Sequence, residues 1–247
     1  MGAIKELGTN TPRLFSLSLK TYHSKLKNYS CMIEDLQERK AQARRVVRQL
    51  KKDYAGAECA LNYETPFQLL IATILSAQCT DVRVNIVTKE LFAKYPDADS
   101  MSRAPVKTLE NLVKTTGFFR NKAKNIHAAS RALADEFDGE VPKDLATLVA
   151  LPGVGRKTAN VVLGTAYGIP SGIVVDTHVG RLTKRLGLTD KGDAVQIERE
   201  LMEVVPKKEW IDFSHRLIHH GRAVCAARKP KCEGCHFLKF CPQIGVV

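Results

Sequence analysis

The sequence has no apolar run long enough to cross a membrane. The longest, Phe67 to Leu75, is well short of the roughly 20 residues that a spanning helix needs. Glycines and a proline interrupt the apolar segment from Val161 to Val175. The N-terminal stretch is basic but lacks a hydrophobic core followed by small residues, so a secretion signal is not expected either. We therefore expect neither a membrane protein nor an exported one.

An even, widely spaced set of cysteines is also missing. There are seven cysteines, of which Cys31, Cys59 and Cys79 are scattered and four gather near the C-terminus. A secreted disulfide framework has a different pattern, and this one suits a reducing interior. The sequence thus indicates an intracellular protein whose clustered cysteines have another use.

Acidic residues are scarce relative to basic ones. Asp and Glu total 26 against 38 Lys and Arg, which gives a formal net charge of +12 and a pI near 9.4. The usual partner of so basic a protein is an anionic polymer, with an anionic membrane surface next. A merely basic, soluble enzyme is the alternative on charge alone.

Alternating strand patterns, repeats and low-complexity tracts are not found, and helical patterns run through the sequence from Ile33 onward. Thr65-Pro66 and Asp176-Thr177 are typical of helix starts. The helices are expected near 33–50, 66–75, 81–95, 105–115, 121–137, 143–150, 157–167, 177–186, 193–204 and 208–222. The sequence therefore predicts an all-α protein of many short helices, large enough for one large domain or two small ones.

Residues 1–32 differ from the rest, being rich in Ser, Thr, Lys and Leu with Glu6 as the single acid. We interpret them as a basic, disordered extension. A start at Met32 and a mitochondrial-type targeting segment are the alternatives, although the segment holds a single arginine.

Four cysteines near the C-terminus are spaced C-x6-C-x2-C-x5-C: Cys225, Cys232, Cys235 and Cys241. Four thiolates can hold either a zinc ion or an iron–sulfur cluster. Zinc sites usually use two closely spaced pairs, and only Cys232 and Cys235 form one here. The spacing and Pro242 after the last cysteine favour a cluster. Basic residues around the frame either offset its charge and meet phosphates or form a solvated surface.

A glycine loop, Leu151-Pro-Gly-Val-Gly155, separates two predicted helices. Gly153 and Gly155 keep side chains away from the backbone, and the amides that start the next helix can face an anion. In a basic protein we expect that anion to be a DNA phosphate, with Arg156 beside it. A tight turn between helices is the alternative.

Lys157 lies at the mouth of the following helix, and Asp176 stands at the start of a later one. Lysine is a nucleophile only when neutral, and the helix terminus, Arg156 and partial burial would all disfavour the ammonium form. Asp176 can cap its helix, move a proton or stabilise a cation. A solvated lysine that contacts phosphate is the alternative. Metal binding by Asp176 and His178 lacks a third ligand.

Five segments together resemble the endonuclease III family, the helix–hairpin–helix DNA glycosylases and abasic-site lyases. They are Leu75-Ser-Ala-Gln-Cys-Thr-Asp81, Gly117-Phe-Phe-Arg-Asn-Lys-Ala123, Leu151-Pro-Gly-Val-Gly-Arg-Lys-Thr-Ala-Asn160, Val175-Asp-Thr-His178 and the four-cysteine frame. The resemblance runs from about Ile33 to Cys241. It differs from the family at Phe118-Phe119, where Leu-Tyr is commoner, so the preferred lesion could differ.

The resemblance implies a helix–hairpin–helix glycosylase fold with two helical domains and a DNA-binding cleft between them. One domain would comprise residues 33–58 and 170–247 with a 4Fe-4S cluster, and the other would be a helical barrel over 59–169. Lys157 would be the Schiff-base nucleophile and Asp176 its partner. Gln78 and Phe118 would fill the gap left by an extruded nucleotide, and Gly153, Gly155 and Arg156 would contact DNA.

The implied function is the excision of oxidised pyrimidines from double-stranded DNA, followed by β-elimination 3′ to the abasic site. The expected partner is duplex DNA with a damaged base or an abasic site, and the expected state is a monomer in the cytoplasm, associated with the nucleoid. An adenine-type glycosylase is disfavoured by Lys157 and by the chain's end soon after Cys241. A non-catalytic helix–hairpin–helix module and a zinc-binding adaptor are two competing hypotheses.

Overall fold

The structure, a computed structural model, describes residues 33–246, and all regular secondary structure in that range is helical. The prediction of an all-α protein is therefore confirmed. The interpretation of residues 1–32 as a basic extension lies outside the described residues. Among the described helices, none combines the length and the apolar character that crossing a membrane requires.

The chain alternates long helices with helices of one or two turns. The α-helices are α2 (Leu36–Asp53), α3 (Pro66–Leu75), α4 (Asp81–Lys94), α5 (Ala98–Ser102), α6 (Val106–Leu112), α7 (Phe119–Glu136), α8 (Leu145–Ala150), α9 (Arg156–Tyr167), α10 (Thr177–Arg185), α11 (Ala194–Val204) and α12 (Trp210–Ala223). Two short 3-10 helices are η1 (Lys114–Thr116) and η2 (Lys207–Glu209).

Side-chain caps explain where several of these helices begin. Thr65 accepts a hydrogen bond from the backbone N of Gln68 at 3.2 Å, with Pro66 in the first turn, as the sequence predicts. Helix α5 is not among the helices predicted from the sequence. It has only five residues, too few to show a period, and its start is fixed by a reciprocal capping box between Asp97 and Ser100.

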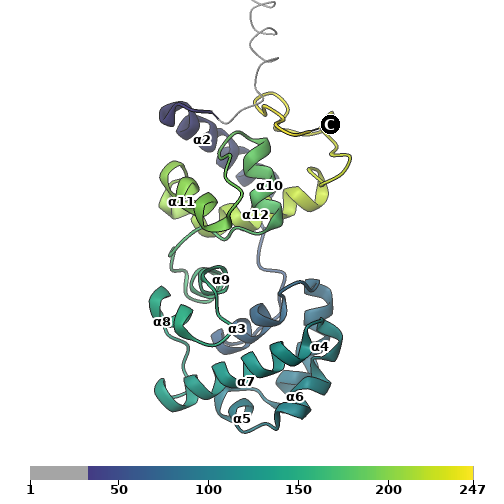
Figure 1. Ribbon diagram of the computed structural model, residues 1–247. Coiled ribbons are helices and arrows are strands. Elements are labelled where there is room, and N and C mark those ends of the chain that lie inside the picture. Colours follow the sequence, from purple (N-terminus) through teal and green to yellow (C-terminus); the bar gives the residue numbers. More distant parts are fainter. Residues whose placement is uncertain (1–32, 247) are drawn as a thin grey trace, which may run out of the picture.

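One hydrophobic core is built around α3, in which every residue from Phe67 to Leu75 is buried. Helices α7 and α9 pack against α3, and α5 and α6 pack against α7. The core takes its residues from the range 61–163. We call these helices, α3 to α9, the lower body, because they form the lower half of the molecule in Figure 1.

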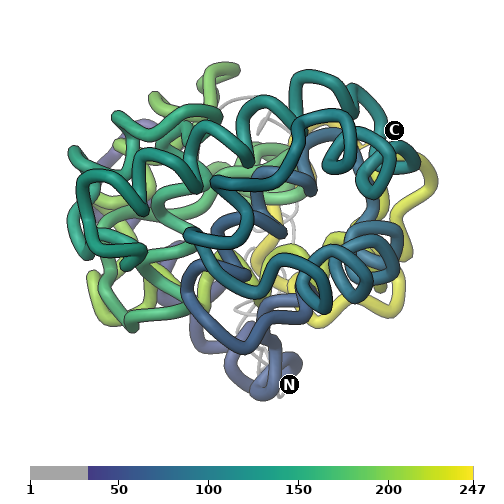
Figure 2. The backbone as a smooth tube through the Cα atoms, turned by 90° about the horizontal axis from the view of Figure 1, so that it is seen from below, coloured from purple at the N-terminus to yellow at the C-terminus, as the bar shows by residue number. Residues whose placement is uncertain are grey.

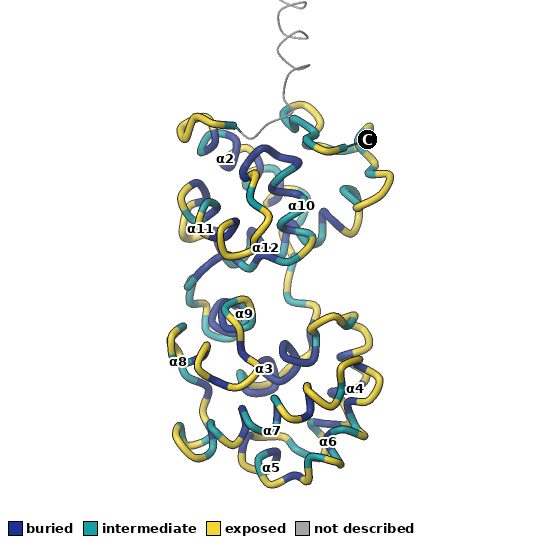
Figure 3. The backbone as a smooth tube through the Cα atoms, viewed as in Figure 1, coloured by how far each residue is buried: buried dark blue, intermediate teal, exposed yellow. Residues whose placement is uncertain are grey.

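A second core joins the first described helix to the last ones. Helix α2 packs against α11 and α12, and α10 packs against α12. This core also takes in Phe237, which is 2% exposed, from the segment after α12. These elements form the upper body in Figure 1, and the buried stretches in Figure 3 gather inside each body.

The described chain passes between the two bodies twice, through the segments 54–65 and 168–176, which we call the first and second connectors. Helix α9 is the lower-body helix that faces the upper body (Figure 1). In the view from below, the lower body stands in front of the upper one (Figure 2). We propose that these bodies are the two domains expected at 33–58 with 170–247 and at 59–169.

Candidate active site and metal centre

The glycine loop before α9 keeps its backbone accessible. Gly153 has a φ of 75°, and a Cβ at this position would lie 2.7 Å from the Cβ of Asn125. Leu151 and Val154 are buried, whereas Gly153 and Gly155 are exposed. Gly155 directly precedes α9, and no side chain caps the helix there. The first-turn amides of α9 are thus available to an anion.

Lys157 is the second residue of α9 and is exposed. The expectation that it would be partly buried is wrong, because the exposed glycine loop leaves the start of α9 at the surface. Arg156, which is expected to act on Lys157 and on DNA, is bonded to a carboxylate: its Nε donates to Glu198 Oε2 at 2.7 Å. The Glu198 contact raises the pKa of Arg156.

Asp176 caps α10, as the sequence predicts. Its Oδ1 accepts hydrogen bonds from the backbone N atoms of His178 and Val179, both at 2.8 Å. These two bonds fix the position of the carboxylate at the start of the helix. The other oxygen, Oδ2, lies 3.8 Å from His178 Nδ1, which is too far for a hydrogen bond.

Lys157 and Asp176 line the same cavity, which has a volume of about 190 Å³. The walls come from the end of α3, the first turns of α9, both connectors and the cleft-facing side of α12. We call it the α9–α12 cavity. In this cavity between the bodies, the amine of Lys157, from before the second connector, lies near the carboxylate of Asp176, at the connector's end.

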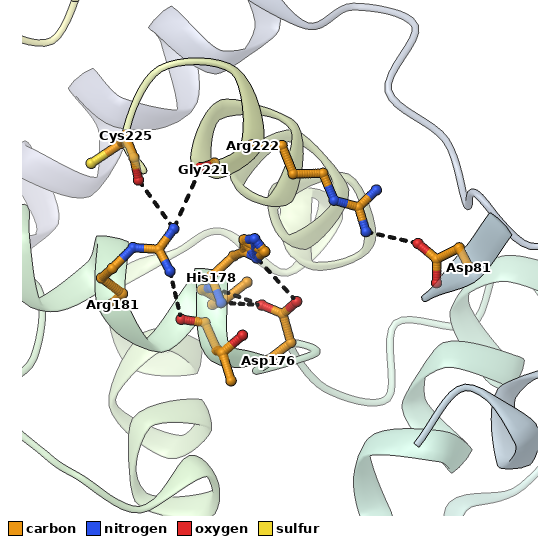
Figure 4. Close-up of polar contacts among 9 residues, drawn as sticks. Asp81, Asp176, His178, Arg181, Gly221, Arg222 and Cys225 are labelled. Carbon is orange, nitrogen blue, oxygen red and sulfur yellow. Dashed lines mark hydrogen bonds and ion pairs between the residues drawn. The ribbon is translucent and has the colours of Figure 1, made fainter. Parts of the chain in front are cut away.

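His178 lies beside Asp176 in this region (Figure 4). Its Nδ1 is buried and has no hydrogen-bond partner among the described residues. Burial lowers the pKa of His178, and Asp176 opposes this effect. Three nearby cations lower it further: Arg181, Arg222 and Lys157. His178 is therefore neutral at pH 7. In the described chain, no group of three metal-binding side chains forms around it.

An ion pair crosses between the bodies at the edge of the cavity. Arg222 Nη2 on α12 donates to Asp81 Oδ2, at the first residue of α4, at 2.7 Å (Figure 4). Both residues line the α9–α12 cavity. In the sequence, Arg222 is one of the basic residues around the cysteines. Its pairing with Asp81 could not be predicted, because no local pattern links two residues that are 141 positions apart.

Gln78 and Phe118 share an uncommon backbone conformation. Their φ values are 52° and 45°, in the left-handed region that side-chain-bearing residues seldom adopt. Both residues are exposed, and Phe118 is 66% exposed. Beneath the second loop, the buried Lys122 donates to the carbonyl of Thr116 at 2.6 Å. Such strain is often found at sites of function, and here it projects two side chains outward.

The four clustered cysteines line one small cavity together with apolar residues of α10 and of the segment after α12. None of the four is in a disulfide. Burial raises the pKa of Cys241 to about 11, and burial also raises the pKa of Cys235. Arg185 Nη1 donates to Cys225 Sγ at 3.2 Å. An electropositive group in the middle would offset the cost of the buried thiolates.

The four thiols can be compared with what each of the two candidate metal groups requires. No three His, Cys, Asp or Glu side chains of the described residues converge closely enough to hold a single ion. A zinc ion needs all its sulfur ligands at about 2.3 Å from one point, whereas a cluster is wider. Four free thiols around one apolar cavity are the donor set that an iron–sulfur cluster requires.

Comparison with known proteins gives a consistent set of matches. Residues 71–207 match the family model of the HhH-GPD superfamily base excision DNA repair protein. The endonuclease III of Synechocystis sp. is 54% identical over 214 residues, which cover 87% of this chain and 98% of that protein.

Two solved structures resemble most of the described fold. A non-covalent endonuclease III–DNA complex has a TM-score of 0.78 and 46% sequence identity, and covers 82% of this chain and 94% of the other. A trapped endonuclease III–DNA covalent intermediate has a TM-score of 0.78 and 45% identity, with coverages of 82% and 95%.

Proposed function

Because the chain belongs to the HhH-GPD superfamily of base excision DNA repair proteins, we propose that the α9–α12 cavity is its active site. Within that superfamily it belongs to the endonuclease III family, and it is a DNA glycosylase that is also an abasic-site lyase and acts on damaged double-stranded DNA. The observation that carries the assignment of the site is that Lys157 and Asp176 share one cavity between the bodies.

In the proposed first step the damaged nucleotide leaves the base stack, since its sugar carbon is inaccessible inside a duplex. The neutral Nζ of Lys157 attacks C1′, and the bond between C1′ and the base breaks. The base leaves with the electron pair of that bond and takes up a proton. Asp176, which is held by two backbone amides, stabilises the positive charge that develops on the sugar.

In the second step the nitrogen loses one of its two protons and the C1′–O4′ bond breaks. Its electron pair goes to O4′, which takes up a proton, and an iminium joins Lys157 to C1′. The iminium acidifies the proton on C2′, and a base removes it. The electron pair left on C2′ forms a double bond to C3′ and expels the 3′ phosphate, which breaks the strand. Water then hydrolyses the iminium and restores the amine. Asp176 Oδ2, which has no backbone partner, is the proposed proton carrier.

Borohydride trapping tests this assignment. The protein is mixed with a duplex that contains an abasic site and reduced with borohydride, which converts the iminium into a stable amine. We expect a covalent adduct that peptide mass spectrometry locates on Lys157. The absence of any adduct, or an adduct on another lysine, would contradict the proposal.

We propose that Gln78 and Phe118 occupy the space of the extruded nucleotide, since both project from strained, exposed loops. Phe118→Ala should lower kcat/KM on damaged duplex about tenfold, because stacking of a base on an aromatic ring contributes roughly 1–3 kcal/mol. Stability should not change, as Phe118 is 66% exposed. Single-turnover kinetics measures the effect. Val195→Ala, at an exposed residue of α11, is the control, and equal slowing in both variants would refute the role.

The amides exposed by Gly153 and Gly155 are proposed to hold one DNA phosphate, and basic side chains are proposed to hold further phosphates. Binding to duplex should therefore weaken steeply with salt. We expect the logarithm of the binding constant to fall with a slope of about −3 or steeper against the logarithm of salt concentration, which corresponds to at least about three phosphates. A fluorescence-anisotropy titration measures it, and a flat dependence would contradict a cationic DNA interface.

We propose that Cys225, Cys232, Cys235 and Cys241 hold a 4Fe-4S cluster, as four free thiols surround one apolar cavity. Such a cluster, when bound, can exchange one electron, but the reaction above contains no redox step. Its proposed role is therefore structural, since it ties the segment after α12 to α10.

Three finer points also belong to the proposal. The excised bases are oxidised pyrimidines, with a range that Phe118 in place of the family's leucine could alter. The enzyme acts as a monomer, because one chain supplies Lys157, Asp176 and the cluster ligands. A cytoplasmic, nucleoid-associated location follows from the substrate.

A further inference from the structure

A buried carboxylate on α11 joins the helix of Lys157 to the upper body. The side chain of Glu198 is 5% exposed. Its Oε2 accepts from Arg156 Nε at 2.7 Å, and its Oε1 accepts from Arg156 Nη2 at 3.1 Å. The same Oε1 accepts from Asn160 Nδ2 at 2.8 Å. Because Arg156 and Asn160 are one turn apart, Glu198 holds one side of the start of α9.

The second connector rests on the same group. Ser171 Oγ donates to Asn160 Oδ1 at 2.8 Å. A Cβ at Gly172 would overlap the carboxylate of Glu198 and the amide of Asn160, so the backbone passes directly over them. Four residues later the connector reaches Asp176. We call Glu198, Arg156, Asn160, Ser171 and Gly172 the Glu198 network.

This network contacts a face of α9 next to the one that lines the cavity. Lys157 and Val161 line the α9–α12 cavity, whereas Glu198, Arg156 and Asn160 do not. Successive residues of a helix point about 100° apart, so Arg156 can bind α11 while Lys157 points into the cavity. The network therefore touches both the helix of the amine and the connector of the carboxylate without reaching the substrate space.

We propose that Glu198 is a positioning residue that holds Lys157 opposite Asp176; this role rests on the proposed function of those two residues. A bidentate pair between arginine and a carboxylate permits one relative orientation, which a sliding apolar contact would not impose. Nucleophilic attack needs the amine within about 3–3.5 Å of C1′, and a displacement of roughly 1 Å can cost about a hundredfold in rate.

Glu198→Gln tests the role with almost no change in shape. Glutamine has one acceptor oxygen, and its amide nitrogen would face a donor of Arg156 or Asn160. We expect single-turnover cleavage of an abasic duplex to slow roughly 10- to 100-fold. Affinity for a duplex with an uncleavable tetrahydrofuran abasic analogue should stay within about threefold, since no Glu198 atom lines the cavity.

A double-mutant cycle identifies the partner. Arg156→Gln should slow cleavage, and Arg156→Gln combined with Glu198→Gln should be no slower than the slower single variant, because one contact is removed in each case. Multiplied effects in the double variant would overturn the proposal, since they would mean that the two residues act separately.

Leu201→Ala separates positioning from general destabilisation. Leu201 is one turn further along α11, is 0% exposed and belongs to the upper core. Its variant should lower the Tm at least as much as Glu198→Gln does, yet cleave within about twofold of the wild-type rate when assayed well below both midpoints. Equal slowing in both variants, or a wild-type rate in Glu198→Gln, would overturn the positioning role. A loss of duplex affinity in Glu198→Gln that accounts for its whole loss of cleavage rate would also overturn the positioning role.

Amide hydrogen exchange keeps this proposal distinct from that of the active site. Without DNA, exchange across residues 159–163, whose amides form the first hydrogen bonds of α9, should quicken in Glu198→Gln but not in Leu201→Ala, because the start of α9 is released. Unchanged exchange would refute the role of Glu198 even if Lys157 forms the borohydride adduct. If the wild-type protein forms no adduct while exchange quickens, the chemistry assigned to Lys157 fails and Glu198 remains a clamp on α9.

Discussion

Lys157→Ala should abolish strand cleavage at an abasic site, with a loss of at least about a thousandfold in rate, and should abolish the borohydride adduct. No other amine replaces a covalent nucleophile that is removed. The fold should remain intact, because Lys157 is exposed and alanine favours the helix that contains it. Gel analysis of a labelled abasic duplex measures both products.

Binding separates this result from a folding defect. Affinity for the tetrahydrofuran duplex should stay within a few-fold of the wild type, because the amides of the glycine loop remain. Lys107→Ala removes a lysine that is paired with Glu110 on α6, far along the chain from the cavity, and should cleave normally. Nicking by a pure Lys157→Ala variant at the wild-type rate would end the assignment of the nucleophile.

Cys241→Ser should remove the iron–sulfur absorption and destabilise the upper body. Cys241 packs against the second core together with Cys225 and Cys235, next to Phe237. Losing a structural metal group costs on the order of 5 kcal/mol or more of folding free energy, which corresponds to a fall in Tm of about 10–20 °C for a chain of this size. Visible spectroscopy and thermal melting, followed by circular dichroism, measure the two effects.

Metal analysis identifies the group itself. The wild-type protein should contain four iron atoms and four sulfides per chain, and the control Cys79→Ser should keep them, since Cys79 packs against the lower core instead. One zinc ion per chain with no iron would contradict the cluster. An unchanged Tm in Cys241→Ser would contradict its structural role.

Local patterns in the sequence predicted the features that depend on neighbours along the chain. The helix starts at Thr65 and Asp176 have side chains that bond to amides two or three residues ahead, so a short window of sequence is enough. The all-α class followed for the same reason. The helix expected at 121–137 begins two residues earlier, immediately after the left-handed Phe118, a conformation that composition does not indicate.

The contacts across the two bodies could not be predicted in this way. Arg156 finds Glu198 42 residues later, and Asp81 finds Arg222 141 residues later, so each pairing exists only once the bodies are stacked. One sequence signal was available: Glu198 lies beside Ile197 and three residues before Leu201 on the apolar side of α11. A carboxylate on such a side requires a cation, which would have directed attention to Arg156.

The order of elements along the chain also shapes how the protein is made. Helix α2 leaves the ribosome before the lower body, but the helices it packs against, α11 and α12, are synthesised after it. The lower body can close while translation continues, whereas α2 must wait with its apolar side uncovered. The cysteines follow α12 in the chain, so the upper body is completed only after the segment that carries them has been synthesised. A nascent chain stalled near residue 205, with α9 outside the exit tunnel but α11 and α12 not yet outside it, should therefore already protect α3 from proteolysis while leaving α2 open to cleavage.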